Sequence, residues 1–242
     1  MSSSEHAPRS GFRPFGSPET VFQNPWYSVE RQAMDFIDPI SGVVRKSSTE
    51  GGQMNYVRML PGVQVVGDMP GDKTLLLPQE RYVTNLVYGE PVWHYELPGG
   101  GIEAHDSGHG VEFDEEAVIA AARREFGEET GYEADDYTIV GSLRGLMTHS
   151  GMSMHHTVTV LAQGIKRRSD GALHETTEII GQAEEYSWDD AHEMYLNSQG
   201  LRTPDGRKII SSANTANSLN IAHRYLERAR HFGKKVIDLK TD

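Results

Sequence analysis

Cysteine is absent from the 242 residues of this chain. Its absence excludes disulfides, thiolate zinc sites, iron–sulfur clusters and cysteine nucleophiles. The sequence also lacks any apolar run near the roughly 18 residues that a membrane helix needs. Its first residues contain no apolar segment of the kind found in secretory signals. From these absences we expect a soluble, cytoplasmic protein.

Positive charge is also in short supply. Lys and Arg number 23 against 35 Asp and Glu, which gives a formal net charge of −12. Such a surface repels phosphate backbones and anionic lipids, so we expect neither nucleic acid nor membrane as a partner. A small phosphate-bearing substrate is still compatible with this charge, because acidic side chains can recruit a divalent metal that in turn holds phosphate.

The pattern of apolar residues and turn formers predicts a mixed α/β (α+β) domain after a flexible arm over residues 1–20. The tripeptide Pro70-Gly71-Asp72 predicts a turn, and hence a hairpin over Val63–Leu77. Strands are expected at 55–59, 62–69, 73–77, 92–97, 137–143, 157–162 and 183–188. Helices are expected at 114–130, 189–198 and 213–232. Strands before and after a central helix favour a β-sheet sandwiched between helices.

The helix expected at 114–130 carries the most informative side chains. Residues three and four apart share one face of a helix, so Glu125, Glu128 and Glu129 converge. Three carboxylates this close repel one another unless a cation neutralises them, and their hard oxygens suit Mg²⁺ or Mn²⁺. The alternative interpretation is a solvated acidic face with an ordinary salt bridge.

Neighbouring residues of this helix have separate expected roles. Arg124, four positions before Glu128, is placed to hold that carboxylate. Ala117 and Ala121 lie on the Glu125 face, where we expect them to leave room for metal and water. The stripe expected to anchor the helix in the core is Val118, Ala122 and Phe126.

The spacing of these residues resembles the signature of the Nudix hydrolases. Its fixed positions here are Gly110, Glu116, Arg124, Glu125, Glu128, Glu129 and Gly131, with Phe126 and Tyr132 in the apolar slots. The resemblance implies the Nudix fold and hydrolysis of a diphosphate bond with two or three Mg²⁺ (or Mn²⁺) ions. The first glycine of the family signature usually belongs to a Pro-x-Gly turn, which here is Pro98-Gly99-Gly100. About ten extra residues then separate that turn from the helix, so either Gly100 or Gly110 is its equivalent, and Glu116 shares this ambiguity.

More of the chain resembles the ADP-ribose pyrophosphatase branch of the family. The matching segments are Asn24-Pro25-Trp26, Leu76–Tyr82 with its Gln-x-Arg, and Tyr95-Glu96-Leu97-Pro98-Gly99-Gly100. The resemblance implies three sets of site residues. The metal ligands would be Gly99 through its carbonyl, Glu116, Glu125, Glu128 and Glu129. The catalytic candidates are Glu128, Glu129 and a late-loop glutamate, Glu175 or Glu178. The substrate-binding candidates are Arg58, Arg81, Glu96 and His155.

The same resemblance implies a division of the chain and a substrate. Residues 1–23 would be a flexible arm, 24–58 an N-terminal strand segment that forms a homodimer, and 59–235 the Nudix hydrolase domain. The expected reaction is ADP-ribose to AMP and ribose 5-phosphate. Residues 149–156 place histidine where this branch usually has an acid, which leaves nucleotide-sugar, NADH and coenzyme A diphosphatases open. A Nudix-fold sensor that binds a nucleotide without cleaving it is a further alternative.

Overall fold

The computed structural model describes residues 12–24, 27–38, 41–103, 114–143, 145–147, 155–173, 179–196 and 208–232. The chain divides into two compact units, Met1–Leu60 with Met147–His155 and Pro61–Leu146 with His156–Asp242. Within the described ranges, no helix combines the length and apolar character that crossing a membrane would require.

The first unit is a four-stranded antiparallel sheet. Its strands are β1 (Phe12–Gln23), β2 (Tyr27–Ile37), β3 (Val44–Lys46) and β4 (Gln53–Met59), with a short 3₁₀ turn η1 (Ser48–Glu50) between the last two. The central strand β2 pairs with each of the other three. Residues 12–20, expected within the flexible arm, thus lie in a strand. Homodimer formation through residues 24–58 stays a prediction.

In its described residues, the second unit contains two larger sheets, a two-stranded sheet of β8 and β12, and four helices. Its strands are β5 (Gly62–Gly67), β6 (Lys73–Glu80), β7 (Val92–Glu96), β8 (Tyr132–Glu133), β9 (Asp136–Val140), β11 (His156–Gln163), β12 (Lys166–Arg167), β13 (Ile179–Ile180), β14 (Glu184–Ser187) and β15 (Lys208–Ser211), together with β10 (Leu146–Met147), of which Leu146 belongs to this unit. Its helices are α1 (Tyr82–Tyr88), α2 (Glu115–Thr130), α3 (Trp188–Leu196) and α4 (Ala213–Phe232).

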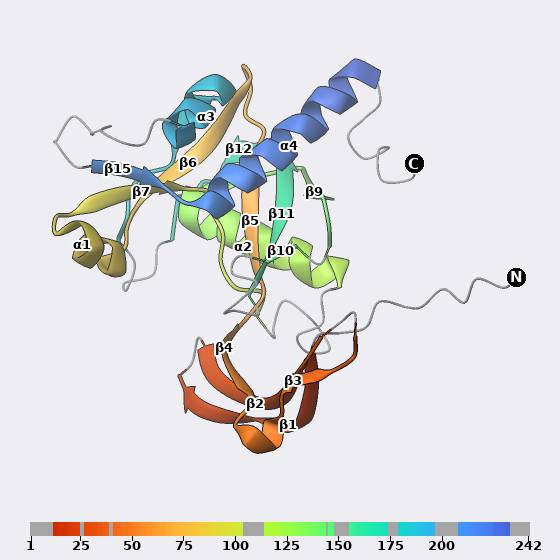
Figure 1. Ribbon diagram of the computed structural model, residues 1–242. Coiled ribbons are helices and arrows are strands. Elements are labelled where there is room, and N and C mark those ends of the chain that lie inside the picture. Colours follow the sequence, from red (N-terminus) through yellow and green to blue (C-terminus); the bar gives the residue numbers. More distant parts are fainter. Residues whose placement is uncertain are drawn as a thin grey trace, which may run out of the picture. The chain divides into compact units, whose positions relative to one another are not determined.

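One sheet joins β5, β9, β10 and β11, and the other joins β6, β7, β13, β14 and β15 (Figure 1). In the first, β11 runs parallel to β5 and antiparallel to β9. Adjacent residues of β5 face different cores: Val65 packs in the core beneath α2, and Val66 in the core formed with α3 and α4. The sheet is therefore covered on both faces by helices, and the predicted mixed sheet between helices is confirmed.

The hairpin predicted over Val63–Leu77 is wrong. The turn exists, with Gly71 and Asp72 at positive φ and a single bridge between Met69 and Lys73. Beyond that bridge, β5 pairs with β11 and β6 pairs with β7, β13 and β14, in separate sheets. Both strands are almost wholly buried, but β6 lies inside its sheet between other strands, whereas β5 is an end strand that pairs with β11 alone among the named strands.

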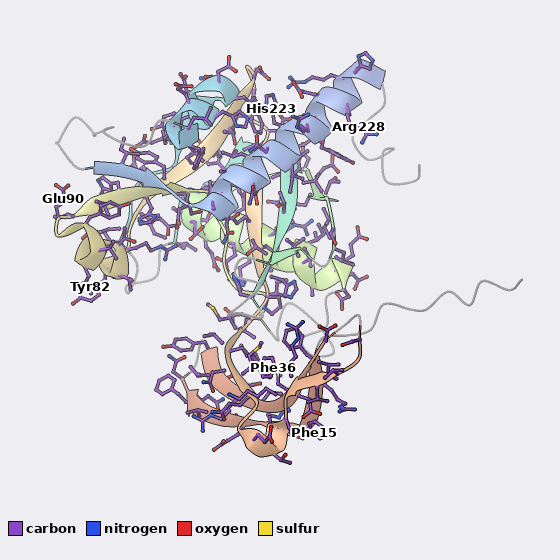
Figure 2. All side chains as sticks on the ribbon, in the orientation of Figure 1. Phe15, Phe36, Tyr82, Glu90, His223 and Arg228 are labelled. Carbon is purple, nitrogen blue, oxygen red and sulfur yellow. The ribbon has the colours of Figure 1, made fainter. Side chains whose placement is uncertain are left out.

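Helix α1 was not expected from the sequence. Its polar side chains face the protein, and its apolar side chains face solvent. Two polar side chains hold it: Thr84 is bonded to His94 Nε2 at 2.7 Å, and Asn85 donates to Glu80 and accepts from the Val92 N–H. Its apolar side chains point outward, as Tyr82 does in Figure 2. The exposed fractions of Tyr82, Val83, Leu86 and Val87 are 64–75%. Tertiary hydrogen bonds thus attach this helix without burying any of its residues.

Helices α3 and α4 meet through a stack of aromatic rings. Trp188 and His223 stack with centroids 4.8 Å apart, and His192 Nε2 lies 3.0 Å from His223 Nδ1. The pKa of His192 is lowered, chiefly by burial and next by the neighbouring His223, while Asp189 and Glu227 oppose the shift. The folded protein therefore binds a proton at His192 less tightly than the unfolded chain does.

We expect the free energy of unfolding to fall as the pH is lowered through about 6.5, the ordinary pKa of histidine. The unfolded chain takes up the proton first, so the contribution of neutral His192 is fully present above this range and is lost below it. Urea unfolding at pH 7.5, 6.5 and 5.5 measures the slope, which His192→Gln should reduce. The exposed His231, changed to Gln, is the matched control; an equal change of slope in both variants would contradict the assignment to His192.

Candidate active site around helix α2 and the Gly99–Gly100 turn

Helix α2 begins and ends where its capping residues predict. The Asp114 carboxylate accepts from the Ala117 N–H at 2.6 Å, and Gly131, at φ +70°, donates its N–H to the Gly127 carbonyl. A negative N-cap and a left-handed glycine C-cap are favourable at these ends. The local sequence therefore fixes where α2 begins and ends.

The inward face of α2 changes from apolar to acidic along its length. Ala117 and Ala121 are fully buried in the core, and Glu125 and Glu129 follow on the same i, i+4 stripe. The predicted room for metal and water beside the two alanines is therefore wrong, because the sheet packs against them. The predicted core stripe of Val118, Ala122 and Phe126 is confirmed, with each fully buried.

The turn after β7 lies against the acidic half of this stripe. The carbonyls of Pro98 and Gly100 accept from the Val65 and Val63 N–H groups of β5, at 2.8 and 2.9 Å. Between them, the Gly99 N–H donates to Glu129 Oε2 at 2.7 Å. A Cβ on Gly100 would meet Glu125 Oε1 at 2.3 Å. Two carboxylates of α2 thus contact consecutive glycines of the turn.

Arg124 supplies the positive charge beside these carboxylates. Its guanidinium lies 2.8 Å from Glu125 Oε1 and donates to the Gly101 carbonyl at 3.0 Å. The predicted contact to Glu128 is present but longer, at 3.5 Å. Arg124 therefore fastens the helix to the turn more than it holds Glu128.

The three glutamates that converge on α2, Glu125, Glu128 and Glu129, differ in exposure. Glu129 is 6% exposed, and the side chains of Glu125 and Glu128 are 13% and 42% exposed. Within the described ranges, no three His, Asp or Glu side chains are gathered closely enough to hold a metal ion. The donor chemistry still suits a hard divalent cation, because the carboxylates of Glu125 and Glu129 both lie against the Gly99–Gly100 turn. The Glu128 carboxylate is more exposed and lies 3.5 Å from Arg124.

The remaining predicted metal ligand, Glu116, lies apart from this cluster. It is exposed in the first turn of α2, nine residues before Glu125. At 1.5 Å per residue this separates their Cα atoms by about 14 Å along the helix axis. The structure does not bring Glu116 together with the other three glutamates. Glu175, Glu178 and Gly110 lie outside the described residues.

Arg81 and Glu96 form an ion pair at the ends of β6 and β7. Arg81 Nε and Nη2 donate to Glu96 Oε2 at 3.3 and 2.8 Å. His94 Nδ1 lies 3.7 Å from Glu96 Oε1, and the pKa of His94 is lowered, mainly by burial. The carboxylate thereby orients a guanidinium that is itself half exposed.

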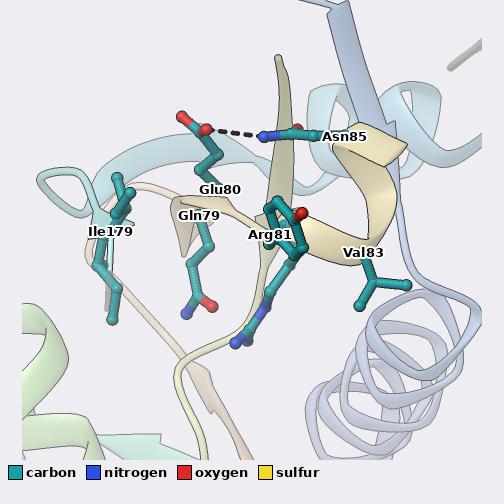
Figure 3. A pocket seen from close by; sticks show the side chains of 8 residues that line it. Gln79, Glu80, Arg81, Val83, Asn85 and Ile179 are labelled. Carbon is teal, nitrogen blue, oxygen red and sulfur yellow. Dashed lines mark hydrogen bonds between the residues drawn. The ribbon is translucent and has the colours of Figure 1, made fainter. Parts of the chain in front are cut away.

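A cavity of about 430 Å³ adjoins this ion pair (Figure 3). It is lined by Gln79, Glu80, Arg81, Tyr82, Val83, Asn85, Ile179 and Ile180. Gln79 also donates to Glu129 Oε1 at 3.4 Å, so one side chain of the cavity wall contacts the carboxylate cluster. No role for Gln79 is predicted from the sequence. The available signal is that Gln79 lies two residues before Arg81, which directly follows β6 in extended conformation, and residues two apart in extended chain share a face.

The other two substrate-binding candidates, Arg58 and His155, belong to the first unit. Arg58 Nε lies 2.8 Å from Glu30 Oε1, and Tyr56 donates to the second oxygen of Glu30. The hydrogen bond from Tyr56, the largest contribution, and the contacts with Arg58 lower the pKa of Glu30. Substrate binding by Arg58 and His155 stays a prediction.

The NUDIX domain family model matches residues 60–211, more than half of the chain, and the chain therefore belongs to the NUDIX family. A solved structure described as that of an ADP compounds hydrolase is similar in fold, with a TM-score of 0.57 and 20% sequence identity. The match covers 90% of this chain and 97% of that one. No curated protein sequence matches significantly. The sequence-based identification of a Nudix hydrolase is confirmed.

The two glycines of the turn should differ in their tolerance of a methyl group. A Cβ on Gly99 would lie 2.1 Å from the Val63 carbonyl oxygen, a backbone atom within a sheet. On Gly100 its three nearest contacts would all be atoms of the Glu125 carboxylate, the end of a side chain and not backbone. We expect Gly99→Ala to lower the free energy of unfolding by about 1–3 kcal/mol and Gly100→Ala by less than about 1 kcal/mol. Urea unfolding of both variants checks this, and equal losses would contradict it.

Proposed function

We propose that this protein hydrolyses the pyrophosphate bond of a nucleoside diphosphate linked to a second moiety, with Glu125, Glu128 and Glu129 holding divalent metal. The observation that carries the proposal is the placement of Glu125 and Glu129, both largely withdrawn from water, against Gly99 and Gly100. Like charges in such a place favour a bound cation. Nudix hydrolases generally use divalent metal such as Mg²⁺.

Metal at this site would neutralise charge on the phosphoryl oxygens and lower the pKa of a bound water. The protein's own part is to orient the donors. The Gly99 N–H fixes one oxygen of Glu129, Arg124 fixes Glu125, and β5 fixes the turn that carries the Gly99 carbonyl. Positioned donors are not reorganised when the substrate arrives, which is how such sites contribute to rate.

Arg81 is the proposed ligand of the diphosphate. Its planar guanidinium presents several N–H donors, and Glu96 occupies one edge and sets its orientation. Glu96 would thus act on substrate through Arg81. The cavity beside Arg81 provides space for the rest of the substrate.

In this hydrolysis the water oxygen bonds to one phosphorus atom, and the bridging oxygen leaves with the other phosphate. A carboxylate must take the proton that the water loses. Glu128 is the most exposed of the three glutamates that converge on α2. Glu129, Glu175 and Glu178 are the other candidates from the sequence. Glu128 has the advantage that its carboxylate is not withdrawn into the turn.

ADP-ribose is the proposed substrate, giving AMP and ribose 5-phosphate. The proposal rests on the resemblance of the sequence to that branch and agrees with the description of the similar structure as an ADP compounds hydrolase. The test is a hydrolysis screen over ADP-ribose, nucleotide sugars, NADH, dinucleoside polyphosphates and coenzyme A, with Mg²⁺ and with Mn²⁺. Tight nucleotide binding without turnover in either metal would instead identify a sensor.

Replacing Glu129 with Gln should lower Mg²⁺-dependent AMP release from ADP-ribose by about 100-fold or more, because the amide cannot supply the carboxylate charge. Glu128→Gln, at a more exposed position, tests the charge with less disturbance of the turn. The matched control is Glu115→Gln, in the first turn of the same helix and outside the cluster. Near-normal turnover in the Glu129 variant would remove the metal assignment.

Arg81→Ala should raise KM by about tenfold or more, because the diphosphate loses a charged hydrogen-bond donor. Arg81→Lys should recover only part of this loss, since an ammonium lacks the planar fork. Steady-state kinetics on the substrate found in the screen measures both. Arg230→Ala removes an exposed arginine paired with Asp72 and should leave KM unchanged. An Arg81→Ala variant with normal KM would exclude Arg81 as a phosphate ligand.

A further inference from the structure

Among the residues that the structure describes, one buried polar atom beside the carboxylate cluster has no hydrogen-bond partner. Gln79 is 2% exposed, and within the described part of the chain its Oε1 makes no hydrogen bond. Its Nε2 donates to Glu129 Oε1 at 3.4 Å. Buried carbonyl oxygens are nearly always paired, so an unpaired one in a substrate-sized site indicates a missing donor.

Glu129 fixes which way this amide points. An ionised carboxylate only accepts hydrogen bonds, and the other oxygen of Glu129 already accepts from the Gly99 N–H. The reversed amide would bring two oxygens together. The NH₂ group of Gln79 therefore faces Glu129, and Oε1 is left for another partner.

Gln79, which carries this unpaired oxygen, is one of the residues that line the cavity beside Arg81. Figure 3 shows the side chains of Gln79 and Arg81 leaving the end of β6 on the same side, with Glu80 on the opposite side toward Asn85. Arg81 directs Nε and Nη2 to Glu96. The same wall thus carries a donor group, the guanidinium, and an acceptor, Gln79 Oε1.

We propose that Gln79 Oε1 accepts a hydrogen bond from an O–H group of the bound complex. This inference rests on the proposed function. A phosphate oxygen cannot satisfy Gln79, because both are acceptors and would repel each other, whereas Arg81 suits phosphate. The partner of Gln79 is therefore a water of the metal's hydration shell or a hydroxyl group of the substrate. The two ends of the wall then fix the direction in which a substrate lies.

Gln79→Leu tests this inference, because leucine has a similar volume and no acceptor. Loss of one hydrogen bond to a buried group corresponds to an effect on the order of tenfold. If the donor is metal-bound water, the affinity for Mn²⁺ alone, measured from the free Mn²⁺ signal in electron paramagnetic resonance, should fall about tenfold. If it is a substrate hydroxyl, Mn²⁺ affinity should be unchanged. KM should then rise about tenfold for ADP-ribose and much less for analogues lacking the sugar hydroxyls.

Thr74→Val is the matched control. Thr74 also lies on β6, is fully buried and has an unpaired hydroxyl within the described residues, but it precedes Gln79 by five positions. That spacing corresponds to about 16 Å along the strand. We expect this variant to keep both Mn²⁺ affinity and KM.

Mn²⁺ affinity and KM both within twofold of the unmodified protein in Gln79→Leu would overturn the inference. Should that variant unfold, the unmodified protein supplies the measurement. The ¹³Cδ resonance of Gln79 should shift on addition of Mg²⁺ or of AMP; no shift, when the Gly99 resonances do shift, would also overturn it. The proposed function is judged separately, by turnover of the unmodified protein in the substrate screen.

Discussion

The arrangement of the site depends on one buried carboxylate. Glu129 is almost withdrawn from water and is bonded to the Gly99 N–H of the turn and to Gln79 of β6. It therefore joins three segments that are far apart in the sequence. A buried charge is tolerated only when donors surround it. The two glycines follow from the same constraint, since side chains at these positions would collide with β5 or with Glu125.

Helix α2 has two functions along a single stripe. Its first two turns bury alanines against the sheet, and the next two present carboxylates to the turn. The packing that stabilises the domain thus sets where the carboxylates lie along the helix axis and in which direction they point. Arg124, bonded to Glu125 and to the Gly101 carbonyl, adds a second link between the helix and the turn.

Local signals in the sequence were sufficient for α2, whose limits follow from Asp114 and Gly131, and for α4, whose apolar residues recur at helical spacing. They were insufficient wherever pairing is non-local. β5 and β6 are consecutive and separated by a turn, yet the energy of burial places them in different sheets. The room expected beside Ala121 was likewise wrong, because a helical pattern gives the face of a residue but not what packs against it. Helix α1 was missed since aromatic and β-branched residues favour strands, and its anchors, His94 and Val92, lie outside it.

The exposure of the apolar side chains of α1 has a consequence for how its sequence can change. The helix buries none of its own residues, so its outer side chains can change without opening a cavity in either core. Tyr82 and Val83 nevertheless line the cavity beside Arg81. Under the proposed function, substitutions on the outer face of α1 would change the shape of this cavity and leave Glu125, Glu128, Glu129 and both cores as they are.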